Sequence, residues 1–144
     1  MKIALVQFDI EWAAPAHNRE RLDGILSGLG AVDLIVLPEM FSTGFATKPE
    51  GIAEEAPCAS LEWMKAKASA LGSAIVGSIA LHDGGKYVNR VYFVKPDGNV
   101  TEYDKHNLFT FSGEHRLFTR GSDRKIVEWR GVRFLLNVCY DLRF

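Results

Sequence analysis

The sequence has little of what membrane, secreted or nucleic-acid-binding proteins usually carry. It holds only two cysteines, Cys58 and Cys139, which predicts free thiols and a reducing compartment, the cytoplasm. Lys and Arg number 17 against 18 Asp and Glu, so no basic excess favours nucleic acid. No apolar run approaches the roughly 20 residues of a membrane helix, and Asp9 comes too early for a signal peptide. We therefore expect neither nucleic acid nor a membrane as a partner.

The composition is that of one globular domain with a real core. Hydrophobic residues make up 47% of the 144 residues and charged residues 24%, as in ordinary soluble domains. Apolar runs predict buried strands, and spacings of three and four predict helices. Continuous apolar strands are typical of an α/β fold whose sheet is covered on both faces. The predicted helices are 17–29 and 60–71, the latter capped by Ser60, and the predicted strands are 2–8, 32–37, 74–81, 87–95, 100–103, 125–130 and 132–138.

Three reactive side chains follow predicted strands. Glu39 closes the apolar run 34–38, Lys105 follows the short strand 100–103, and Cys139 follows the strand 132–138. Open α/β sheets place ligands at the ends of their strands. A thiol, a carboxylate and an amine together can carry out covalent hydrolysis.

Each of the three also has an ordinary structural interpretation. A single cysteine is most often a small core residue, and most glutamates and lysines are simply solvated. Three observations favour chemistry. Polar residues surround Cys139, apolar neighbours of Glu39 would raise its proton affinity, and Glu114 shares the long irregular segment 105–122 with Lys105.

Other candidate sites carry less weight. Cys58 lies in a predicted loop with no base nearby in sequence, so we interpret it as incidental. The spacing of His106, His115 and Cys139 fits no compact zinc pattern, so no metal is expected. The glycine turn at 83–86 lacks the residues of a phosphate loop.

Four separated segments resemble the motifs of the nitrilase, or carbon–nitrogen hydrolase, superfamily. In order, they are 37–41 (LPEMF), 103–109 (YDKHNLF), 112–115 (SGEH) and 137–144 (NVCYDLRF). The opening strand 3–7 (IALVQ) is similar as well. One short motif is weak, whereas four in the family's order are strong.

The resemblance implies an α-β-β-α sandwich and assigns a role to each residue. Cys139 is expected to be the nucleophile, Glu39 the general base, and Lys105 with the backbone N–H of Tyr140 the oxyanion stabiliser. Glu114 is expected to support this triad. The resemblance implies no cofactor, and a homodimer in the full-length form.

Within the superfamily, the residues around the motifs look most like omega-amidases. These are segments 38–45, 127–131 and 139–144, and the implied reaction is hydrolysis of the terminal amide of a 2-oxo acid such as 2-oxoglutaramate. Family members continue for roughly another hundred residues, so we expect 1–144 to be a carbon–nitrogen hydrolase domain incomplete at its C-terminus. Two alternatives remain open: a non-catalytic fragment, and a superfamily enzyme for a nitrile, a carbamoyl amine or a deaminated peptide amide.

Overall fold

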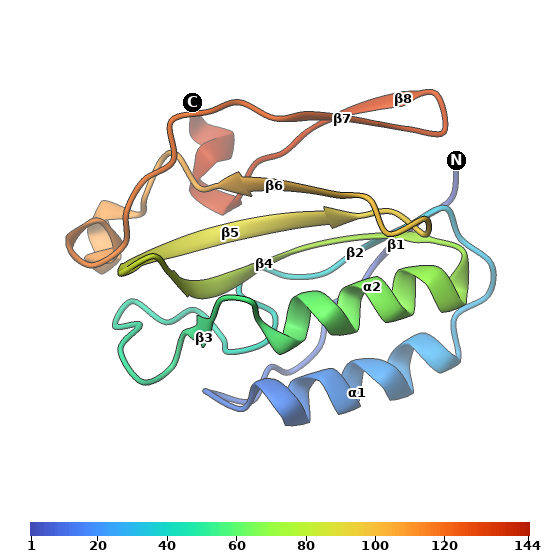
Figure 1. The fold of residues 1–144 in the computed structure, drawn as a ribbon, viewed down its shortest axis with the longest axis horizontal. Coiled ribbons are helices and arrows are strands. Elements are labelled where there is room, and N and C mark those ends of the chain that lie inside the picture. The colour runs from blue at the N-terminus through green and yellow to red at the C-terminus, as the bar shows by residue number, and fades with distance from the viewer.

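A six-stranded mixed sheet forms the centre of the computed structural model, which describes all of residues 1–144 (Figure 1). The strand order is β1-β2-β4-β5-β6, and the short β3 pairs with β4. Strands β1, β2 and β4 are parallel, whereas β4, β5 and β6 are antiparallel. The strands are β1 (Ile3–Leu5), β2 (Leu34–Val36), β3 (Glu54–Glu55), β4 (Ala74–Asp83), β5 (Lys86–Val94) and β6 (Val100–Asp104).

Two helices, α1 (Pro15–Ser27) and α2 (Ala59–Leu71), cover one face of this sheet (Figure 1). Their buried side chains pack with apolar residues of β2 and β4 in the largest core cluster. Both helices were predicted, but α1 begins earlier because Pro15 occupies its first turn, where a missing N–H costs nothing. The predicted cap at Ser60 is wrong. Cys58 holds the N-cap position, and the Ser60 N–H donates to Glu54 Oε2 at 3.1 Å.

A hairpin of β7 (Ile126–Trp129) and β8 (Val132–Leu135) lies on the opposite side of the sheet from the helices (Figure 1). Val127 packs there against apolar residues of β2 and β5. The predicted strand pair is confirmed, and Arg130 and Gly131 form its turn with positive φ. Ile3 and Leu5 pair with Leu34 and Val36 on this side, and both remain exposed. The hairpin therefore covers only part of the second face.

The strand predicted for 132–138 ends early, at Leu135. Leu136 and Val138 stay buried although they leave the strand pairing. Cys139 begins a short 3₁₀ helix, η3 (Cys139–Arg143), four residues beyond the strand. Two further 3₁₀ turns, η1 (Thr110–Ser112) and η2 (Glu114–Arg116), lie in the segment predicted to be irregular. Neither α1 nor α2 has the length and apolar character to cross a bilayer.

Candidate active site

Lys105 lies between two carboxylates at the end of β6. Its Nζ is 2.7 Å from Glu39 Oε1 and 3.0 Å from Glu114 Oε2. The side chains of Lys105 and Glu114 are both 0% exposed, and that of Glu39 is 19% exposed. Three residues from separate segments thus form one ionic cluster: Glu39 follows β2, Lys105 follows β6, and Glu114 begins η2.

The carboxylate of Glu114 is fixed by the chain around it as well as by Lys105. Its Oε2 accepts the backbone N–H of Phe109 at 2.6 Å. Gly113 precedes it with φ of 83°, a left-handed conformation that glycine adopts without strain. A buried carboxylate is stable as an anion only where such donors and a cation compensate for lost water. Glu114 is therefore built into the site as a permanent partner of the lysine.

The charge state of Lys105 follows from these neighbours. Burial alone lowers the pKa of the ammonium, but the hydrogen bonds and negative charges of Glu39 and Glu114 outweigh it and hold the pKa above its ordinary value. Lys105 is thus a cation at neutral pH. An ammonium has three donors, so a third N–H can serve a substrate oxygen after two have gone to the carboxylates.

Cys139 stands at the start of η3 with an unusual backbone. Its φ is 43°, in the left-handed region that a non-glycine residue seldom adopts. Its side chain is exposed, and it lines a cavity of about 180 Å³ together with Glu39. It also borders a second cavity of about 520 Å³, whose aromatic walls are Phe109, Phe111 and Tyr140. The thiol is therefore reachable from solvent and close to the carboxylate.

The environment of Cys139 favours the neutral thiol. Burial raises the pKa of Cys139 first, the nearby charge of Glu39 raises it further, and Lys105 only partly offsets both. A thiol in this state becomes a nucleophile only when a base removes its proton. Glu39 is the carboxylate placed to do so, since it shares the cavity with the sulfur.

A buried aspartate ties the Cys139 turn to the segment that carries Lys105. Asp141 Oδ2 accepts the Tyr103 hydroxyl at 2.8 Å and the Val138 N–H at 3.0 Å. Its Oδ1 accepts the backbone N–H of Asn107 at 2.7 Å. Tyr103 and Asn107 flank Lys105, so this one carboxylate links the turn that begins at Cys139 to the backbone on both sides of Lys105.

Sequence reasoning noticed Asp141 only as a polar neighbour of Cys139, and it missed Asn89 altogether. Asn89 lies in β5 and is fully buried. Its Nδ2 donates to Glu39 Oε1 at 2.9 Å and to Glu114 Oε1 at 3.1 Å. A polar residue inside the apolar strand predicted for 87–95 is the signal that could have revealed it.

The other candidates, Cys58 and the histidines considered as zinc ligands, do not form a second site. Cys58 is 2% exposed and packs in the helix-covered core. His106 Nδ1 lies 2.7 Å from the carbonyl oxygen of Gly121, and its Nε2 lies 2.7 Å from the Arg120 guanidinium. No group of three or more His, Cys, Asp or Glu side chains is placed to hold a metal ion.

The two thiols give a direct test of which one is reactive. Burial is the first cause of a raised pKa at both Cys58 and Cys139, so accessibility decides the outcome. With limiting iodoacetamide we expect the adduct on Cys139, located by peptide mass spectrometry. Cys58→Ser should keep the label and Cys139→Ser should lose it. Labelling of Cys58 in folded protein, with Cys139 untouched, contradicts the assignment of the nucleophile.

Comparison with known proteins identifies the family to which this chain belongs. The sequence profile named carbon-nitrogen hydrolase matches residues 2–144. The chain belongs to the carbon-nitrogen hydrolase family. The family predicted from the four motifs is confirmed by this match, and the α/β prediction is confirmed by the fold.

Several relatives of this carbon-nitrogen hydrolase chain are named amidases. It is 41% identical over 145 residues to the omega-amidase YafV of Yersinia enterocolitica, with 100% of this chain and 56% of the relative covered. It is 31% identical over 146 residues to the 2-oxoglutaramate amidase of Bacillus subtilis, covering 99% and 56%. The likeness to omega-amidases expected from the flanking residues is therefore confirmed. The chain spans about half the length of these relatives.

A solved structure extends the likeness to three dimensions. XC1258 from Xanthomonas campestris, a CN-hydrolase superfamily protein with an arsenic adduct in its active site, superposes with a TM-score of 0.96. The identity is 40%, and the match covers 100% of this chain and 55% of XC1258. This chain therefore has the fold of a solved CN-hydrolase superfamily protein.

Proposed function

We propose that the complete protein hydrolyses the terminal carboxamide of a short 2-oxo acid, such as 2-oxoglutaramate, to the acid and ammonia. The observation that carries this proposal is the buried ammonium of Lys105 held between Glu39 and Glu114 beside an exposed thiol. The choice of substrate is supported by the names of the relatives, an omega-amidase and a 2-oxoglutaramate amidase.

In the first half-reaction, Glu39 takes the proton of the Cys139 thiol as the sulfur attacks the amide carbonyl carbon. The carbonyl oxygen becomes an oxyanion and accepts the free N–H of Lys105 and the backbone N–H of Tyr140. Donors fixed in place before the reaction are effective because they need no reorganisation as charge develops. Glu39 then returns its proton to the nitrogen, the C–N bond breaks, ammonia leaves, and a thioester on Cys139 remains.

In the second half-reaction, Glu39 acts again as a base. It removes a proton from a water molecule that attacks the thioester carbon, and the same donors hold the second oxyanion. The C–S bond breaks, the acid is released, and the proton returns through Glu39 to the thiolate. Glu114 keeps its contact with Lys105 throughout and holds the ammonium in place. No cofactor takes part in this scheme.

The family resemblance also supports two proposals about the setting. We propose a homodimer for the full-length form, and a cytoplasmic location, which the two unpaired cysteines support. The partner at the active site is a small-molecule amide.

The substrate is tested by ammonia release in a coupled assay on the full natural polypeptide. We expect 2-oxoglutaramate to be turned over with a kcat/KM at least about 100-fold above that of a nitrile of similar length, because the proposed donors, Lys105 and the Tyr140 N–H, bind a carbonyl oxygen that a nitrile lacks. Cys139→Ala is the blank. Faster turnover of the nitrile, or of a carbamoyl amine, would replace the proposed substrate while leaving the family chemistry in place.

A further inference from the structure

The side-chain amide of Asn89 donates hydrogen bonds to two carboxylates, which no apolar residue at this position could do. It is fully buried in β5, on the same face as Val91 and Phe93. Both N–H groups of its side chain are used, one on Glu39 Oε1 and one on Glu114 Oε1. Its Oδ1 is buried without a hydrogen-bond partner. The side chain is thus oriented entirely by the two carboxylates that it faces.

The polarity of this amide follows from charge. Carboxylates only accept hydrogen bonds when ionised, so a rotated amide would place its carbonyl oxygen against two negative groups. Around Lys105 the structure gathers two carboxylates and one ammonium. Asn89 adds two donors to this cluster without adding charge, and it bridges Glu39 and Glu114.

Asn89 also determines which oxygen of Glu39 remains available. Oε1 accepts from Lys105 Nζ at 2.7 Å and from Asn89 Nδ2 at 2.9 Å. Neither contact involves Oε2. A carboxylate with one oxygen doubly bound cannot rotate freely, so Oε2 is held at a fixed place beside the cavity that Cys139 shares with Glu39.

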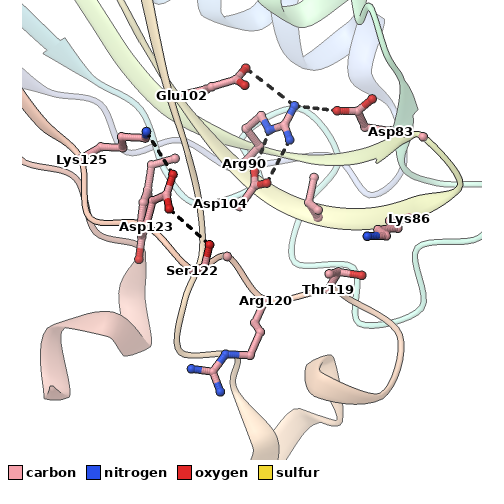
Figure 2. Close-up of a pocket in the computed structure, with 14 residues that line it drawn as sticks. Asp83, Lys86, Arg90, Glu102, Asp104, Thr119, Arg120, Ser122, Asp123 and Lys125 are labelled. Atoms are coloured by element: carbon pink, nitrogen blue, oxygen red, sulfur yellow. Dashed lines mark hydrogen bonds and ion pairs between the residues drawn. The ribbon is translucent and has the colours of Figure 1, made fainter.

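The backbones of Asn89 and Lys105 are joined by a hydrogen bond. The Lys105 N–H donates to the Asn89 carbonyl oxygen at 2.9 Å. The adjacent pair in the register, Arg90 and Asp104, projects from the other face of the sheet. There the Arg90 guanidinium binds both oxygens of Asp104, at 2.6 and 2.9 Å, and also reaches Asp83 (Figure 2). The ion pair on one face therefore fixes the spacing of the amide and the ammonium on the other.

We propose that Asn89 is a positioning residue for thiol activation: it binds Glu39 Oε1 and so presents Oε2 to the Cys139 thiol, while it spaces Glu39 from Glu114 around Lys105. This inference rests on the proposed roles of Glu39 and Cys139. It does not depend on which amide is the substrate.

The test compares two buried asparagines in the full natural polypeptide. Asn89→Asp keeps the shape of the side chain and replaces its N–H₂ donor by an acceptor oxygen. It also adds a third carboxylate beside Glu39 and Glu114, close to Lys105 and Cys139. We expect kcat for ammonia release to fall about 10- to 100-fold with little change in KM, since a base displaced by about 1 Å loses that much. The acidic limb of kcat against pH should move to higher pH, because a third negative charge makes Glu39 retain its proton.

Asn18→Asp is the matched control. Asn18 is also fully buried, and its amide binds only backbone groups of Glu11 and Ser42. Its variant should lose stability without moving the pH profile. If Asn89→Asp does not fold, Asn89→Ser replaces it: this variant lacks the double donor but adds no charge, so kcat should fall while the acidic limb stays where it is.

A second measurement separates this inference from the choice of substrate. The rate of Cys139 alkylation by iodoacetamide, followed against pH, should shift to higher pH in Asn89→Asp and stay unchanged in Asn18→Asp. If the wild type releases no ammonia from 2-oxoglutaramate but shows this shift, the substrate is wrong and the role of Asn89 stands. A folded Asn89→Asp with wild-type kcat and alkylation profiles overturns the inference.

Discussion

Glu39→Gln is expected to reduce kcat for amide hydrolysis by about 10²- to 10⁴-fold, the usual contribution of a positioned general base. The substitution is nearly isosteric, and the amide oxygen of glutamine can still accept from Lys105 and Asn89. Its other terminal atom becomes an N–H₂ group that faces Cys139 and cannot take a proton. Burial still raises the pKa of the Cys139 thiol when the charge of Glu39 is gone, so without a base most of the thiol stays protonated. Initial-rate kinetics measure the loss of kcat, and thermal unfolding of each variant shows whether the fold is kept.

Glu54→Gln is the control for this substitution. Glu54 is also largely buried, and it binds the Ser60 N–H and lies 3.6 Å from Arg19, on the helix side of the sheet. Its variant should lose some stability and keep its kcat. A Glu39→Gln protein that folds and turns over the amide at the wild-type rate would remove Glu39 from the mechanism and leave Glu114 as the carboxylate to test next.

The order of apolar and polar residues was enough to predict most of the fold. The runs that became β2 and β4 are mainly apolar, and the spacings in 17–29 and 60–71 match the two helices. The end of β8 could not be predicted in this way. Leu136 and Val138 are buried as strand residues are, so the pattern continues, but the backbone turns away where Asp141 accepts the Val138 N–H. The hydrophobic pattern predicts which residues are buried, but it does not predict which partners accept the hydrogen bonds of the backbone N–H groups.

Only those residues of the candidate site that lie in short sequence motifs could be predicted. Glu39, Lys105, Glu114 and Cys139 each sit in a recognisable motif, and the structure places the first three in direct contact. Asn89 has no such segment, because its role depends on contacts 50 residues and 25 residues away in the chain. A polar residue on the buried face of a strand indicates that a partner exists, but the partner becomes known only when the sheet is assembled.

Lys105→Met is expected to be the most destabilising single change in the site as well as an inactivating one. Methionine has a similar length and can fill the space, but it leaves Glu39 and Glu114 facing each other without a cation. Breaking a buried ion pair by removing one partner costs about 3–5 kcal/mol, and Glu114 has no access to solvent to reduce that cost. Chemical denaturation at pH 7 measures the loss. Lys65→Met, which removes an exposed pair with Glu62, should cost no more than about 1 kcal/mol.

The pH dependence of this loss distinguishes an unpaired charge from a packing defect. Without Lys105, the two carboxylates repel each other, so a proton bound by either of them stabilises the folded state. This relief is present at low pH and is lost as pH rises and both carboxylates become charged. The gap between Lys105→Met and wild type should therefore narrow from pH 7 towards pH 5. Adding Glu39→Gln to Lys105→Met should recover part of the stability, since one of the two facing charges is gone. A gap that is constant with pH and unaffected by the second substitution would mean that Lys105 contributes by packing alone, and the ionic cluster would lose its role in the site.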